Sequence, residues 1–162
     1  MMNDLQIADP VVNAYVLLLN TSDIVTRYAE TRLSKLGITS TQHMVLMTLS
    51  ICTQPPALTE LSQRLFRTKN SLTTVIDNME NNGLVTRVRD HADRRAIKIV
   101  ATKKGTELLE RSRIPSRELV YHVMSCCSEE DLNRLSEVLQ KVRSHVLKEL
   151  GPELPGVGDH HQ

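Results

Sequence analysis

Hydrophobic side chains recur at helical spacing between Pro10 and Gly37. An apolar residue returns every three or four positions after Asp9-Pro10, and Gly37 provides a stop signal. The pattern therefore predicts one long helix near the N-terminus.

The C-terminal third of the chain also has a helical pattern, which begins after Thr102. Pro115 lies inside this segment and predicts a kink or a break, because proline cannot donate the backbone hydrogen bond of a helix interior. The acidic stretch 128–131 is typical of the N-terminal cap of a last helix. That helix has a narrow apolar stripe at Leu132, Leu135, Leu139, Val142 and Val146. A stripe of this width is typical of a coiled-coil seam and predicts a partner helix.

Three shorter helices are predicted between these long ones. The sequence TSTQ at 39–42 has the form of a capping box, and Pro55-Pro56 ends the helix that follows. A second short helix is expected from Thr59, which we assign as its N-cap. A third begins at Lys69, and Gly83 closes it.

The helix expected at 69–82 has two unlike faces. Its apolar face consists of Leu72, Val75, Ile76 and Met79. Its opposite face consists of Asn70, Thr73, Thr74 and Asp77. Because Asn and Thr are mediocre helix formers, their use on an exposed face indicates hydrogen bonding to something outside the protein. The edges of DNA base pairs fit this role.

The hydrophobic period changes from helical to strand-like after Gly83. Residues 84–90 and 96–102 alternate with a period of two, which predicts a β-hairpin. The connection between the strands is basic, with His91, Arg94 and Arg95. Helix, turn, polar-faced helix and charged hairpin are the order of a winged helix-turn-helix. In that motif the second helix enters the major groove of DNA and the hairpin tip reaches the minor groove.

The formal net charge of +1 is unevenly distributed along the chain. Residues 59–105 contain ten Lys and Arg against five Asp and Glu, a net charge of +5. The rest of the chain has ten against fourteen, a net charge of −4. A basic middle between acidic ends predicts that the middle binds a polyanion.

Other classes of protein are disfavoured. No apolar stretch reaches the roughly 20 residues that a membrane helix needs, and the first residues lack a signal-peptide pattern, so we expect a cytoplasmic protein. We find no phosphate-binding glycine loop, GxSxG elbow or HExxH helix, so we expect neither an enzyme nor a cofactor. The three cysteines, Cys52, Cys126 and Cys127, lack the CxxC spacing of a zinc site.

Two alternatives remain open from the residues alone. The basic face is also suited to an acidic protein partner in place of DNA. His122 and Cys126 lie four apart on an expected helix, and with Cys127 they permit a regulator that senses thiol oxidation or a metal. Against this second alternative, no third metal ligand lies nearby in the sequence. Adjacent residues on a helix also point in different directions, which disfavours a disulfide between the two cysteines.

Three short motifs frame the expected hairpin. They are Gly83-Leu84-Val85-Thr86-Arg87 at its entry, Asp93-Arg94-Arg95 at its tip and Thr102-Lys103-Lys104-Gly105 after it. With these motifs together, the chain resembles the MarR family (multiple antibiotic resistance regulators) over nearly its whole length. The resemblance implies a mainly α fold with a small β-hairpin wing. It divides the chain into an N-terminal dimerisation helix at 1–38, a winged helix-turn-helix DNA-binding lobe at 39–105, C-terminal dimerisation helices at 106–150 and a flexible tail at 151–162.

The resemblance also implies which residues contact DNA. On the recognition helix these are Lys69, Asn70, Ser71, Thr73 and Thr74. On the wing they are Arg87, Arg89, His91 and Arg94, with Arg94 in the minor groove and Arg87 on a phosphate. Asp93 and Arg95 are expected to brace the wing through an ion pair. Two positions depart from the family pattern, since many relatives have a basic residue where Thr74 stands and a leucine where Ala101 stands.

The expected function is therefore transcriptional regulation by a homodimer on a palindromic operator in double-stranded DNA. The resemblance implies repression, which a small ligand relieves by binding between the dimer helices and the DNA-binding lobe. No metal is expected.

Overall fold

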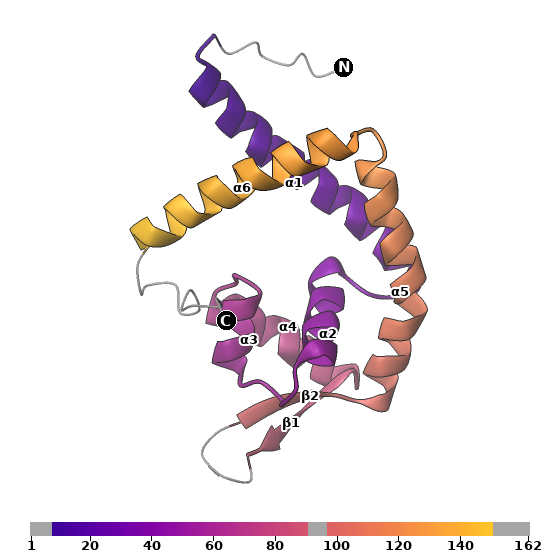
Figure 1. Cartoon of the computed structure of the whole chain (residues 1–162). Coiled ribbons are helices and arrows are strands. Elements are labelled where there is room, and N and C mark those ends of the chain that lie inside the picture. The colour runs from indigo at the N-terminus through magenta and orange to yellow at the C-terminus, as the bar shows by residue number, and fades with distance from the viewer. Residues whose placement is uncertain (1–7, 91–96, 151–162) are drawn as a thin grey trace.

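The computed structural model describes residues 8–90 and 97–150, and its elements follow the order that the sequence predicts (Figure 1). They are α1 (Pro10–Leu33), the 3₁₀ turn η1 (Ser34–Leu36), α2 (Ser40–Ile51), α3 (Leu58–Arg64), α4 (Lys69–Asn81), β1 (Val85–Arg89), β2 (Ile97–Ala101), α5 (Lys103–Met124) and α6 (Glu129–Leu150). The expected mainly helical fold with a two-stranded hairpin is confirmed. Figure 1 shows α2, α3, α4 and the hairpin gathered into one lobe, with α1 and α6 extending above it.

Side chains at the helix ends explain where several of these elements begin. Asp9 accepts a hydrogen bond from the amide of Val11 at 2.8 Å, at the start of α1. The predicted capping box of α2 is present, since Thr39 accepts from the amide of Gln42 at 3.2 Å and Gln42 accepts from the amide of Thr39 at 3.0 Å. Such caps satisfy backbone donors that a helix leaves unpaired, and each contributes about 1 kcal/mol.

The start of α3 differs from the prediction. The N-cap is Ala57, whose side chain cannot accept a hydrogen bond, and Thr59 lies inside the helix. The reason lies elsewhere in the chain, because Ala57 forms an isolated antiparallel bridge with Lys98 of β2. The amide of Ile99 donates to the carbonyl of Pro56 at 2.9 Å beside it. This pairing holds the chain extended up to Ala57, and the helix begins directly after it.

The two strands form an antiparallel ladder in which Arg87 is opposite Ile99. The sequence predicted a kink or a break at Pro115. Helix α5, which follows β2, continues through this residue, so a break there is wrong. Proline has the backbone φ angle of a helix, and its missing amide removes a single hydrogen bond within the turn. Figure 1 shows α5 as a curved, continuous helix.

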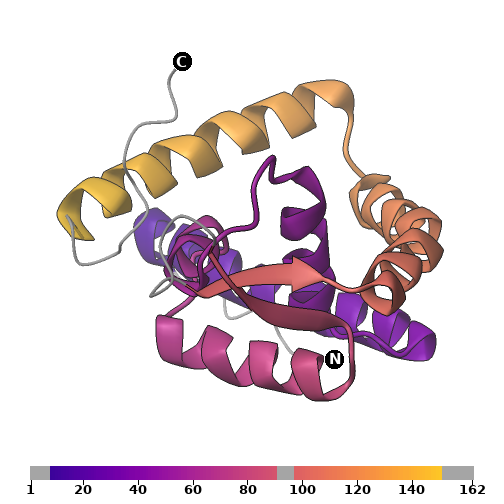
Figure 2. The ribbon, with the colours of Figure 1, turned by 90° about the horizontal axis from the view of Figure 1, so that it is seen from below.

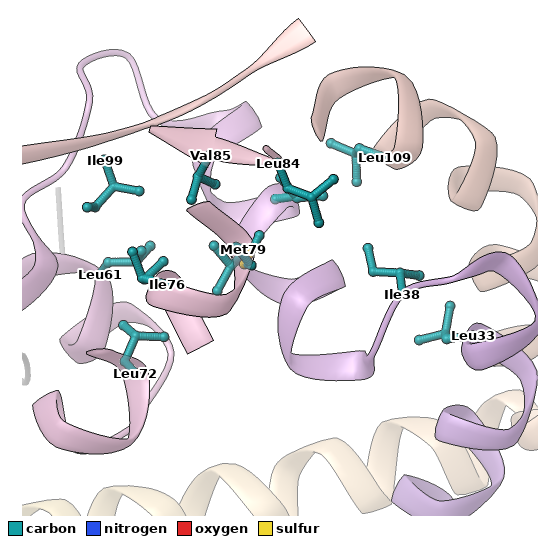
Figure 3. Close-up of a cluster of buried hydrophobic side chains, with 12 residues drawn as sticks. Leu33, Ile38, Leu61, Leu72, Ile76, Met79, Leu84, Val85, Ile99 and Leu109 are labelled. Carbon is teal, nitrogen blue, oxygen red and sulfur yellow. The ribbon is translucent and has the colours of Figure 1, made fainter. Parts of the chain in front are cut away.

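The core of the lobe forms where α3, α4 and the hairpin meet. Leu61, Ile76 and Ile99 point toward one another in Figure 3, and each is fully buried. Burial of one such side chain stabilises the fold by about 1.5–3 kcal/mol. The same cluster continues to the end of α1 through Leu33 and to α5 through Leu109. Helices α1 and α5 are therefore attached to the lobe by apolar packing.

A buried histidine adds a polar link between the lobe and α5. His43 of α2 is only 8% exposed, and burial lowers the pKa of its imidazole. Its Nε2 atom lies 3.0 Å from the hydroxyl oxygen of Ser116, and this hydroxyl also donates to the carbonyl of Ser112. The buried imidazole is thus paired, as a polar group removed from water needs to be.

The outer helices α1 and α6 leave apolar side chains exposed. Within the described chain no residue of α6 is buried and α6 packs extensively against no other element. Figure 2 shows α6 at the edge of the molecule opposite α4. Among the described helices none combines the length and apolar character needed to span a bilayer.

Candidate nucleic-acid interface

Helix α4 is anchored by one face and exposed on the other. Leu72, Ile76 and Met79 are fully buried against the lobe. The hydroxyl of Thr68 caps the helix by accepting from the amide of Ser71 at 3.2 Å. Figure 2 shows α4 along one edge of the lobe, with the hairpin beside it. An exposed helix next to a hairpin is the arrangement that a winged helix-turn-helix presents to a duplex.

The five recognition-helix residues expected from the sequence lie in the first half of α4. Four of them, Lys69, Asn70, Ser71 and Thr74, are exposed, and Thr73 is half-buried. The Thr73 hydroxyl donates to the carbonyl of Lys69 at 2.8 Å, which leaves its oxygen available only as an acceptor. These residues surround the N-terminal end of the helix, the end that favours phosphate oxygens.

Arg87 joins the recognition helix to the wing. Its guanidinium forms ion pairs with Asp77, at 2.6 Å, and with Glu80, both on α4. The amide of Arg87 also donates to the Glu80 carboxylate at 2.9 Å. This backbone hydrogen bond, together with the guanidinium, lowers the pKa of the Glu80 carboxyl. Arg87 therefore sets the position of β1 relative to α4, and its contact with a phosphate stays a prediction.

The wing is only partly within the described chain. Arg89 is exposed at the end of β1, opposite Ile97 of β2. Toward the tip of the hairpin, where its described part ends, Lys98 and Asp90 form an ion pair of 3.7 Å. The remaining wing positions, His91, Asp93, Arg94 and Arg95, lie outside the described residues, so their contacts stay predictions.

Arg67 is a basic side chain that we did not assign to this surface from the sequence. It is exposed in the turn between α3 and α4, directly before the N-cap Thr68. Within the described chain its guanidinium has no ion pair or hydrogen bond. Its sequence position, one residue before the cap of the recognition helix, is the signal that marks it.

His122, Cys126 and Cys127 are arranged differently from the sequence expectation. The ring of His122 stacks on Tyr28 of α1, with ring centroids 6.1 Å apart. The two cysteines follow the end of α5 and lie in the turn before α6. Among the described residues no group of three or more His, Cys, Asp and Glu side chains is placed to hold a metal.

Comparison with known proteins agrees with this geometry. A model of the MarR family matches residues 38–97. The organic hydroperoxide resistance transcriptional regulator of Bacillus subtilis is 32% identical over 126 residues, which cover 76% of this chain and 82% of that protein. The transcriptional repressor MprA of Escherichia coli is 28% identical over 114 residues, which cover 68% of this chain and 63% of MprA.

Solved structures share the fold. MepR of S. aureus, in complex with DNA, is 25% identical with a TM-score of 0.75, over 81% of this chain and 96% of MepR. The organohalide-sensing regulator RdhR, in its form bound to 2,4-dichlorophenol, has a TM-score of 0.78 and is 18% identical, over 85% of this chain and 81% of RdhR.

Proposed function

Because the chain belongs to the MarR family and is a DNA-binding transcriptional regulator rather than an enzyme, we propose that it acts in the cytoplasm as a homodimeric repressor. Its target is a palindromic operator, and a small ligand releases it. The observation that carries the proposal is α4, whose polar first half is exposed beside the hairpin while its apolar face is fixed in the core. We assign dimerisation to 1–38 and 106–150 and DNA binding to 39–105.

The uncovered helices support the homodimer. On α6, Leu139 and Val142 are 40% and 43% exposed, although they belong to an apolar stripe. A second copy of the same helices would cover this stripe, and such closed pairs have two-fold symmetry. Two lobes related in this way read a palindrome with half-site centres roughly one helical turn, or ~10 bp, apart.

The experiment that tests DNA binding is a mobility shift of genomic fragments, followed by sequencing of the fragments that the protein retains. We expect a palindromic motif common to these fragments. Binding to an acidic protein and to no duplex at low ionic strength would instead support an interaction module.

Asn70→Ala tests base reading by the recognition helix. We expect this variant to lose discrimination at one base pair in each half-site, by about 1–3 kcal/mol, because an Asn amide pairs with a base edge. Affinities for a set of operators with single base changes measure the effect. Asn81→Ala, at the other end of α4, is the matched control and should behave like the parent protein. Equal weakening of Asn70→Ala on every sequence would make Asn70 a backbone contact.

Arg94→Ala tests the wing. We expect weaker operator binding and a slope of log affinity against log salt that is smaller by about 0.9, because one phosphate contact is lost. Arg134→Ala, which removes an exposed arginine from α6, is the control and should leave the slope unchanged. An unchanged slope for Arg94→Ala would remove Arg94 from the interface. The same measurement on Arg87→Ala tests its predicted phosphate contact.

A hollow of about 260 Å³ supports the proposed ligand. It lies between α1, the start of α2 and the turn before α4, and its apolar lining includes Val25, Ala29, Met44 and Leu65. The hydroxyl of Ser40, which also lines it, is buried and has no hydrogen-bond partner among the described residues. A ligand here would contact both a dimerisation helix and the turn that leads into α4. It needs only to change the spacing of the two recognition helices by a few ångströms to weaken DNA binding.

Ala29→Leu fills this hollow and tests its use. We expect operator binding to be retained while its sensitivity to a panel of small phenols and aromatic acids falls at least about tenfold, because the added carbons occupy the ligand volume. Release of the operator is measured by fluorescence anisotropy. Ala14→Leu, on an exposed part of the same helix, is the control. Unchanged sensitivity in Ala29→Leu would place the ligand elsewhere.

A further inference from the structure

Cys126 and Cys127 form a close pair of thiols in the turn between α5 and α6. Helix α5 ends at Met124 and α6 begins at Glu129, so neither cysteine is helical. Their sulfur atoms are 3.8 Å apart. Cys126 is exposed and Cys127 is half-buried, and both are free thiols. The pair is therefore accessible to a reagent from solvent. Its two thiols also lie close together, whereas adjacent side chains on a helix diverge.

The spacing of the two sulfur atoms fits a bridging atom better than a disulfide. Adjacent Cα atoms lie about 3.8 Å apart across a trans peptide, below the roughly 4.4 Å at which the usual range for disulfides begins. A direct sulfur–sulfur bond would thus be strained. Two sulfurs bound to one atom at about 2.3 Å are roughly 3.3 Å apart at a bond angle near 90° and about 3.8 Å apart at the tetrahedral angle, so the separation found here is at the upper end of what one bridging atom spans. Arsenic(III) forms bonds of similar length to sulfur.

The small number of ligands around the pair in the described chain indicates which kind of compound the two thiols can bind. A structural zinc ion needs four protein ligands, and among residues 8–90 and 97–150 no third His, Cys, Asp or Glu completes a metal site around the pair. Asp131 of α6 accepts hydrogen bonds from the amide and hydroxyl of Ser128 at 3.0 and 2.6 Å, both through its Oδ2 atom. A trivalent organoarsenical requires only two sulfurs, because its third bond is to its own carbon.

From this geometry we propose that Cys126 and Cys127 together are a chelating site for trivalent arsenicals. In the reaction an arsenic(III) oxide of the form R–As=O condenses with the two thiols. Two arsenic–sulfur bonds form, the arsenic–oxygen bond breaks, and the two thiol protons leave with the oxygen as water. No atom changes its oxidation state. The hydrogen bond that the two thiols share is the largest cause that raises the pKa of the Cys127 thiol.

Phenylarsine oxide is the probe for this site. The full-length reduced protein is incubated with it in an excess of glutathione, and its intact mass is then measured. We expect one phenylarsenic group per chain, replacing two thiol hydrogens, and release by 2,3-dimercaptopropanol but not by glutathione. Cys126→Ser and Cys127→Ser should each weaken apparent binding by at least about 100-fold, because a second linked contact contributes a factor of that order.

Cys52→Ser is the matched control and should bind the probe like the parent protein. Cys52 lies at the end of α2, in a different part of the fold. Thermal melting and a count of reactive thiols verify that each variant is folded and reduced. The proposal would be overturned if Cys126→Ser or Cys127→Ser still bound the probe like the parent protein. It would also be overturned if Cys52→Ser lost binding, or if the parent protein with all three thiols reduced did not bind the probe.

Discussion

Gly105→Ala is expected to destabilise the protein by at least about 3 kcal/mol and to lower its melting temperature by roughly 6–12 °C. Gly105 lies in the first turn of α5, where an added Cβ would be 2.0 Å from the carbonyl oxygen of Leu84 and 3.2 Å from Cδ2 of Leu46. The Leu84 carbonyl cannot simply move aside, because it accepts from the amide of Thr102 at 3.0 Å. Accommodation of the methyl group would separate α5 from the entry to the hairpin.

Gly37→Ala is the matched control for this prediction. Gly37 has a positive φ of 76°, but nothing lies within 4 Å of a Cβ added there. Its substitution therefore introduces only left-handed backbone strain, about 1–2 kcal/mol. Both variants are melted at the same protomer concentration, since the proposed dimerisation would make the melting temperature depend on concentration. Equal stability of the two variants would show that the packing at Gly105 is not tight.

Leu139→Glu combined with Val142→Glu is expected to give a monomer whose operator affinity is lower by about 10²–10⁴-fold. Glutamate on this stripe would bury charge in the proposed dimer interface, where no partner compensates it. A monomer binds one half-site only and loses the gain that a second linked lobe provides. Sedimentation velocity measures the oligomeric state, and a mobility shift measures the affinity.

Lys141→Glu is the control for the dimer prediction. It changes the net charge by the same two units as the double variant, and it lies on the opposite side of α6 from the apolar stripe. We expect Lys141→Glu to remain dimeric. A double variant that stays dimeric would place the interface on other surfaces, with α1 as the next candidate, because Tyr15 and Leu19 there are 62% and 48% exposed.

Short-range patterns in the sequence were sufficient to predict much of the secondary structure. The Thr39–Gln42 capping box and the start of α5 after Thr102 involve residues three or four apart, so short-range hydrogen bonds decide them. The two faces of α4 follow from helical spacing alone, and the hairpin from the change of period. These features depend on neighbours along the chain, and the structure confirms them.

Contacts between distant residues decided the rest. The start of α3 depends on the pairing of Ala57 with Lys98, and no pattern near Thr59 contains that information. The ion pairs of Arg87 with Asp77 and Glu80 of α4 likewise follow from how the elements fold together. Hydrophobic periodicity shows which face of a helix is apolar, but only packing determines what that face meets. The sequence by itself therefore determined most of the elements and which face of α4 is polar, whereas the tertiary structure decided which described side chains beside that face are already paired.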